Sequence, residues 1–231
     1  MFSEAHFSEN LDKLCSRMAA ACEAAGRLLD SVRLLPVTKN HPSNAVEWAL
    51  RAGLGRVGEN RVQEAVVKMD ALGANKVEFE LIGHLQSNKA RVAAERFARV
   101  QTVDSAKLLR RLDAAAGDCG RTLPILLQVN AGEDPAKYGV RCEDCAALLE
   151  TALGLNNVTV EGLMTIAPLD EDPDVARRAF ARLRHTRDSL AAQFQVALSE
   201  LSMGMTDDLE SAIAEGSTQI RVGTALFGTR A

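Results

Sequence analysis

Hydrophobic positions along the chain alternate between two kinds of spacing. Within residues 8–29, apolar side chains return every three or four positions, which predicts an amphipathic helix. The run that follows, residues 32–37, is almost continuously apolar, as is typical of a strand covered on both faces. The two patterns then recur to the end of the chain, so the sequence predicts alternating helices and strands.

Eight strand candidates follow from this pattern. They are residues 32–37, 55–58, 79–83, 100–103, 123–129, 158–165, 198–202 and 219–222. The helices expected between and after them are residues 43–53, 61–72, 88–97, 106–116, 143–153, 173–194 and 208–214. Strands that alternate with helices pair in parallel, and eight such units close into a barrel. We therefore predict one (β/α)8 TIM barrel over residues 1–231 with an extra N-terminal helix; an open, doubly wound α/β sheet has the same local pattern and is the alternative.

Small hydroxyl residues and glycines follow the last two predicted strands. In a parallel barrel the functional site lies at the C-terminal ends of the strands, and the ends of strands seven and eight commonly bind phosphate. Turn formation alone would explain the glycines of either cluster, but two clusters after neighbouring strands favour a phosphate. The candidate ligands are Ser202, Gly204, Arg221, Gly223 and Thr224, whereas Met203 is expected in the pocket wall or the core.

Lys39 follows the first predicted strand, which adjoins the eighth when a barrel closes. It is therefore expected beside the phosphate site, either as a second phosphate ligand or as an amine that forms a Schiff base with a bound carbonyl. A surface lysine without a function is the alternative. Asn60, after the second strand, is either a ligand or the N-cap of the next helix, because Asn60 and Gln63 have the spacing of a capping pair.

Composition narrows the class of protein. The chain has 231 residues, 47% of them apolar, and a net charge of -4 with no basic block, which argues against a nucleic-acid partner. There is no long apolar run and no leader-like pattern in residues 1–10, so we predict a cytoplasmic protein without a membrane segment. Cys142 and Cys145 form a lone CxxC pair, so we predict no metal site and interpret the five cysteines as reduced core residues.

Six segments in order along the chain resemble one family. They are residues 36–39 (PVTK), 57–64 (VGENRVQE), 82–89 (IGHLQSNK), 162–165 (GLMT), 201–208 (LSMGMTDD) and 220–228 (IRVGTALFG). Together they are similar to the pyridoxal-phosphate homeostasis protein family, whose fold resembles the N-terminal domain of alanine racemase. The resemblance implies a monomer that binds pyridoxal 5'-phosphate (PLP) and serves vitamin B6 homeostasis without established turnover, with PLP-dependent client enzymes as partners.

The resemblance also assigns roles to individual residues. It makes Lys39 the lysine that forms a covalent aldimine with PLP, and it places Arg221 at the pyridine nitrogen and Asn60 near the ring. The phosphate-binding segments correspond to Ser202, Gly223 and Thr224, with Met203 and Gly204 close by. The chain departs from the family at His41, where a second lysine is frequent, and at Thr38, where serine is usual.

Two features argue for binding rather than catalysis. An arginine stays protonated, so Arg221 would oppose protonation of the pyridine nitrogen and weaken the electron sink that amino acid chemistry needs. The sequence has a single tyrosine, Tyr138, and we expect no second domain to supply a further base. We therefore predict no catalytic residue. A weak amino acid racemase and a Schiff-base phosphosugar aldolase are the alternatives.

Overall fold

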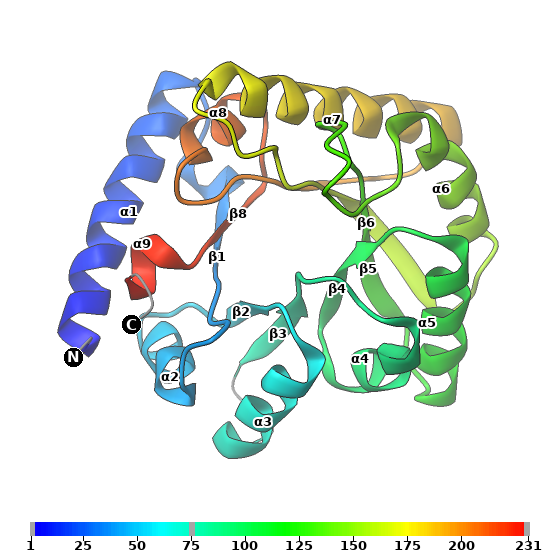
Figure 1. Cartoon of the computed structure of the whole chain (residues 1–231), viewed down its shortest axis with the longest axis horizontal. Helices are drawn as coiled ribbons and strands as arrows, with labels where there is room; N and C mark the ends of the chain where they lie inside the picture. The colour runs from blue at the N-terminus through cyan, green and yellow to red at the C-terminus, as the bar shows by residue number, and fades with distance from the viewer. Residues whose placement is uncertain (1–2, 74–76, 229–231) are drawn as a thin grey trace.

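Parallel strands form a nearly closed barrel in the computed structural model, which describes residues 3–73 and 77–228 (Figure 1). The strands of the described residues are β1 (Arg33–Pro36), β2 (Arg56–Glu59), β3 (Glu78–Leu81), β4 (Arg99–Val103), β5 (Leu123–Gln128), β6 (Val158–Met164), β7 (Glu200–Ser202) and β8 (Gln219–Val222). Their order is β1-β8-β7-β6-β5-β4-β3-β2, and an isolated bridge between Val37 and Gly58 joins the two ends. The predicted barrel is confirmed, because in a doubly wound sheet the strand order would reverse part-way.

Helices surround the strands, as Figure 1 shows. In the described residues they are α1 (Glu4–Ala24), α2 (Ser43–Arg51), α3 (Val62–Leu72), α4 (Ala90–Arg96), α5 (Ala106–Asp118), α6 (Cys145–Leu153), α7 (Pro173–Phe194), α8 (Leu209–Ala214) and α9 (Thr224–Phe227). Short 3-10 turns lie at Leu29–Ser31, Ser87–Lys89 and Cys142–Asp144. The helices α2 to α8 each follow the strand of their unit. None of the helices in the described part of the chain is long and apolar enough to cross a bilayer.

The extra N-terminal helix, α1, covers one side of the barrel beside α8 and α9 (Figure 1). Its buried face carries Phe7, whose ring stacks on Phe227 of α9 with the centroids 5.3 Å apart. The helix ends at Ala24 rather than at residue 29, because Gly26 adopts a φ of 64° that ends the helix. Leu28 and Leu29, which extended the apolar pattern, are exposed in the following turn.

The cysteines are free thiols, but two of them are not core residues. Cys22 and Cys145 are buried, whereas Cys15 and Cys119 are exposed. Cys15 lies on α1 next to the buried Leu14, so the spacing of seven between Cys15 and Cys22 overstated how far they share one face. The prediction of a wholly buried set is therefore wrong.

Polar side chains fill part of the barrel interior. Near the N-terminal ends of the strands, Arg99 contacts Glu161 at 3.0 Å and Glu200 at 3.4 Å. Further along, the Gln101 amide nitrogen donates to Glu80 and, at 2.7 Å, to the Gln219 side-chain oxygen. Each of these interior groups has a specific partner, which offsets the cost of removing it from water.

Candidate functional site

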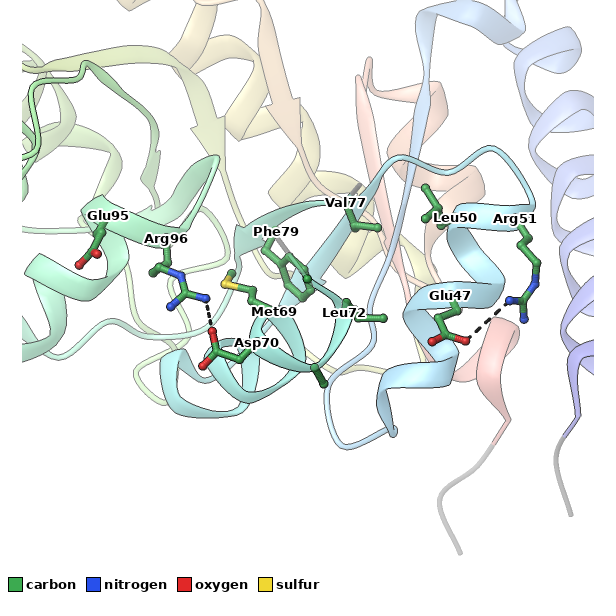
Figure 2. Close-up of a pocket in the computed structure, with 12 residues that line it drawn as sticks. Glu47, Leu50, Arg51, Met69, Asp70, Leu72, Val77, Phe79, Glu95 and Arg96 are labelled. Carbon is green, nitrogen blue, oxygen red and sulfur yellow. Dashed lines mark hydrogen bonds and ion pairs between the residues drawn. The ribbon is translucent and has the colours of Figure 1, made fainter. Parts of the chain in front are cut away.

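A cavity of about 760 Å³ lies outside the barrel among α2, α3 and α4. Figure 2 shows four of its charged side chains in pairs, Arg96 with Asp70 and Arg51 with Glu47, whereas Glu95 points away from them. Arg96 contacts Asp70 at 2.5 Å, and Arg51 contacts Glu47 at 3.7 Å and also pairs with Glu4. Since both arginines already have carboxylate partners, the described residues that line this outer groove offer no uncompensated cation to an anionic ligand.

A second cavity, of about 460 Å³, opens at the C-terminal ends of the strands. Its volume suits a small organic ligand. Five of the eight residues predicted for the site line it, although they come from three separate segments of the chain. They are Lys39, Asn60, Arg221, Gly223 and Thr224.

Lys39 and Arg221 reach this mouth cavity from adjacent strands. β1 and β8 pair in parallel, with Leu35 opposite Arg221 and Pro36 opposite Val222. Gly223 keeps the two strand ends close, because an added Cβ there would lie 3.2 Å from the carbonyl oxygen of Val37. Barrel closure therefore brings the two cations to one cavity, as the sequence predicted.

Arg221 is 4% exposed and is held by neutral acceptors. It donates one bond to the Ser202 hydroxyl at 2.9 Å and another to the Thr165 carbonyl oxygen at 2.8 Å. Burial lowers the pKa of Arg221 to about 10, and the negative charge of Asp208 acts in the opposite direction. The guanidinium thus remains a cation at neutral pH in a fixed orientation.

Ser202, Met203 and Gly204 lie behind the cavity rather than on its lining. The Ser202 hydroxyl is fully buried; it accepts from Arg221 and donates to the Gln101 side-chain oxygen at 2.6 Å. Met203 belongs to the hydrophobic core. Gly204 has a φ of 95°, and an added Cβ would lie 2.5 Å from that of Ala212 on α8. These three residues support the wall of the site.

The hydroxyl that does line the cavity after β7 belongs to Thr206. Sequence reasoning missed it, although it lies in the same LSMGMTDD segment, because the strand ends at Ser202 and the chain turns at Gly204 before reaching the cavity. Thr206 is close to α9, since its hydroxyl accepts from the backbone N–H of Ala225 at 3.4 Å.

Asn60 lines the cavity and does not cap the following helix. The N-cap of α3 is Arg61, and no side chain makes a capping bond there. The capping interpretation of Asn60 is therefore wrong, and its position favours contact with a ligand.

Two ring side chains on the lining were also missed. His84 stacks on Tyr138 with ring centroids 4.0 Å apart, and both contribute to the cavity wall. Burial raises the pKa of the nearby Asp104, whereas the charge of His84 and two backbone amides lower it. His84 directly follows the predicted strand 79–83, so the sequence indicates its position at a strand end, but the stacking on Tyr138 from another loop becomes visible only in the fold.

Comparisons with known proteins find similar sequences over nearly the whole chain. The family described as the N-terminal domain of alanine racemase matches residues 10–231. A pyridoxal phosphate homeostasis protein of Pseudomonas aeruginosa is 42% identical over 223 residues, covering 96% of this chain and 95% of that protein. The chain belongs to the pyridoxal phosphate homeostasis protein family. A homeostasis protein of Aquifex aeolicus is 39% identical over 222 residues, covering 96% of this chain and 97% of that protein.

A member of this fold has been solved with its ligand. The structure of PipY from Synechococcus elongatus, with PLP bound, is 42% identical to this chain and superposes with a TM-score of 0.86. It covers 96% of this chain and 100% of the PipY chain. PipY therefore shares this chain's barrel over nearly its whole length.

Proposed function

We propose that this chain binds PLP in the mouth cavity, holds it as an aldimine on Lys39, and serves intracellular PLP homeostasis. The observation that carries the proposal is that Lys39 and Arg221 line one cavity from adjacent strands, next to Gly223 and Thr224. An amine that can react with an aldehyde thus lies beside donors suited to a phosphate. Membership of the homeostasis protein family and the PLP-bound structure of PipY support it.

The residues after β7 and β8 suit the phosphate of PLP. Thr206 and Thr224 supply hydroxyl groups, and Gly223 lines the cavity where β8 passes into α9. Ser202, whose hydroxyl is already bonded to Arg221 and Gln101, would support the site through Arg221. We propose that Thr206, with Gly223 and Thr224, contacts the phosphate directly.

Arg221 and Asn60 would lie along the pyridine ring. When bound, PLP supplies an aldehyde for an amine and a ring that withdraws electrons once its nitrogen is protonated. The Arg221 guanidinium is a fixed hydrogen-bond donor, so it would face an unprotonated nitrogen and weaken that withdrawal. The arrangement therefore favours holding PLP over amino acid chemistry, and we assign no catalytic residue. We further propose release to PLP-dependent client enzymes from a cytoplasmic monomer.

Borohydride reduction of the PLP-loaded protein, followed by peptide mapping, tests the proposal. We expect the pyridoxyl group on Lys39, loss of the aldimine absorbance in Lys39→Ala, and no change in the control Lys107→Ala, an exposed lysine of α5. A label on another lysine would contradict the assignment. Amino acid racemisation should not exceed that of free PLP; steady turnover that Lys39→Ala abolishes would instead establish an enzyme.

A further inference from the structure

The turn that carries Lys39 is bound from one side by a cluster of three charged residues, Glu59, Glu64 and Lys68, which we call the anchor cluster. Glu59 ends β2, and the other two lie one helical turn apart on α3. The Lys68 side chain is 6% exposed and that of Glu59 is fully buried. Charges are rarely buried without a specific role, because removing them from water is costly.

Lys68 is bonded to both carboxylates and to the turn itself. Its ammonium group donates to the carbonyl oxygen of Thr38 at 2.6 Å, to Glu59 at 2.7 Å and to Glu64 at 2.9 Å. These three acceptors match the three protons of an ammonium group. All the hydrogen-bond donors of the Lys68 ammonium group are therefore used within this cluster, and the group contacts the backbone next to Lys39.

The two carboxylates bind the turn on either side of Lys39. The Thr38 hydroxyl donates to Glu59 at 2.6 Å, and the backbone N–H of Asn40 donates to Glu64 at 2.5 Å. Burial raises the pKa of Glu59, and the bonds from Lys68 and Thr38 oppose that rise. The residues before and after Lys39 are thus both fixed by side chains from β2 and α3.

Backbone pairing with β2 gives this turn little support. β1 and β2 share only the isolated bridge of Val37 with Gly58, followed by one bond from Thr38 N–H to the Gly58 carbonyl in the described structure. The turn itself is closed by a backbone bond of 3.1 Å from His41 N–H to the Thr38 carbonyl oxygen, and Asn40 has a φ of 60°, a left-handed conformation that asparagine adopts more readily than most residues. The side-chain bonds of the anchor cluster add to this local turn and tie it to β2 and α3.

We propose that the anchor cluster, with Lys68 at its centre, positions Lys39 for bond formation with an aldehyde. The cluster acts through the backbone of Thr38 and Asn40, so Lys68 is a positioning residue and not a ligand contact. Reaction rates are sensitive to such placement, because a shift of about 1 Å in a reacting group can slow a step by about a hundredfold. This inference rests on the proposed reaction of Lys39 with PLP.

The test separates bond formation from binding by using two ligands. The neutral amine of Lys39 adds to the aldehyde carbon of PLP and the adduct then loses water, so that a C=N bond replaces the C=O bond. Pyridoxine 5'-phosphate has an alcohol in place of the aldehyde and binds only non-covalently. Two variants break the cluster, Lys68→Met and Glu64→Ala. Because Glu64 is a partly exposed carboxylate, Glu64→Ala should disturb the fold less, and it serves as the test if Lys68→Met does not fold. The matched control is Asp70→Ala, which removes a surface carboxylate from the same helix.

We expect both cluster variants to slow imine formation, followed by stopped-flow absorbance, by tenfold to about a hundredfold. Their affinity for pyridoxine 5'-phosphate should stay within about twofold of the parent protein, and Asp70→Ala should change neither quantity. An unchanged rate in a folded cluster variant would overturn the proposal. So would a parallel loss of both quantities, which would indicate general damage to the cavity.

A ligand-free measurement distinguishes failure of this inference from failure of the proposed function. Competitive acetylation with trace acetic anhydride reports the reactivity of Lys39 without PLP. If the parent protein forms no imine at Lys39, the proposed function fails. The positioning proposal is then decided by acetylation alone. It requires the reactivity of Lys39 to change in Lys68→Met or Glu64→Ala and to stay constant in Asp70→Ala. Equal reactivity in all three variants and the parent protein overturns it.

Discussion

The outer groove and the mouth cavity both contain two cationic side chains, yet they differ in what those cations contact. Arg51 and Arg96 of the groove are paired with carboxylates at the surface. Arg221 of the mouth cavity is bonded instead to a hydroxyl and a carbonyl oxygen. The groove is the larger of the two, at about 760 Å³ against about 460 Å³. Volume alone would therefore select the groove rather than the cavity in which we propose that PLP binds.

The difference is one of charge compensation. The two charges of a surface ion pair nearly cancel, so binding a further anion there gains little free energy. A buried cation that is bonded only to neutral oxygens has lost its hydration without gaining a negative partner. An anionic ligand can supply that negative charge. Among the described residues, Asp208 acts on Arg221 at longer range without a direct bond. Substitutions in the two cavities should therefore have unequal effects.

The largest effect is expected for Arg221→Gln, which removes the buried charge. We expect the free energy of unfolding of the ligand-free protein to fall by about 2–3 kcal/mol, because two charge-assisted hydrogen bonds are lost. Affinity for pyridoxine 5'-phosphate should fall by about tenfold or more. Denaturant titration and equilibrium binding measure the two quantities. Unchanged affinity would remove Arg221 from the ligand site.

Intermediate effects should separate the two hydroxyl residues after β7. Ser202→Ala leaves Arg221 and Gln101 each short of one partner, so unfolding free energy should fall by about 1–3 kcal/mol. Thr206→Val should leave stability nearly unchanged but lower the affinity for PLP by about tenfold, since a charge-assisted bond to phosphate is lost.

Pyridoxal, which lacks the phosphate, provides the control for this pair. Thr206→Val should bind pyridoxal as the parent protein does. If Ser202→Ala instead lost phosphate-dependent affinity at full stability, the original expectation that the Ser202 hydroxyl contacts the phosphate would be restored.

The smallest effect is expected in the outer groove. Arg96→Gln breaks an ion pair with Asp70, whose side chain is 62% exposed, so the free energy of unfolding should fall by only about 0.2–1 kcal/mol. Affinity for PLP should not change. A clear loss of affinity, measured in the same binding assay as for Arg221→Gln, would place a ligand contact in the groove and invalidate the comparison.

The barrel could be predicted from the sequence because hydrophobic spacing is a property of each segment alone. Once the barrel is accepted, the nearness of Lys39 and Arg221 follows, since β1 must lie beside β8. Element ends were less accurate: the first helix was expected to reach residue 29, but Gly26 ends it earlier. The short helix α9 carries too few residues to show a period.

The parts of the site that sequence reasoning missed depend on three-dimensional placement. Whether Ser202 or Thr206 lines the cavity is decided by a turn at Gly204 in a left-handed conformation, which no apolar pattern shows. Lys68 follows Glu64 at a spacing of four on α3, the usual sign of a solvent-exposed ion pair. Only the fold reveals that this pair is buried against the Lys39 turn.

The single bridge between Val37 and Gly58 has a further consequence. It leaves the seam between β1 and β2 without a strand ladder in the described residues, and Lys39 lies two positions beyond the bridge. A ligand bonded to Lys39 while resting against Arg221 and Asn60 would span β8, β1 and β2. Such a ligand would join the two sides of the junction. Ligand binding and closure of the barrel would then be thermodynamically linked, and each would stabilise the other by the same free energy.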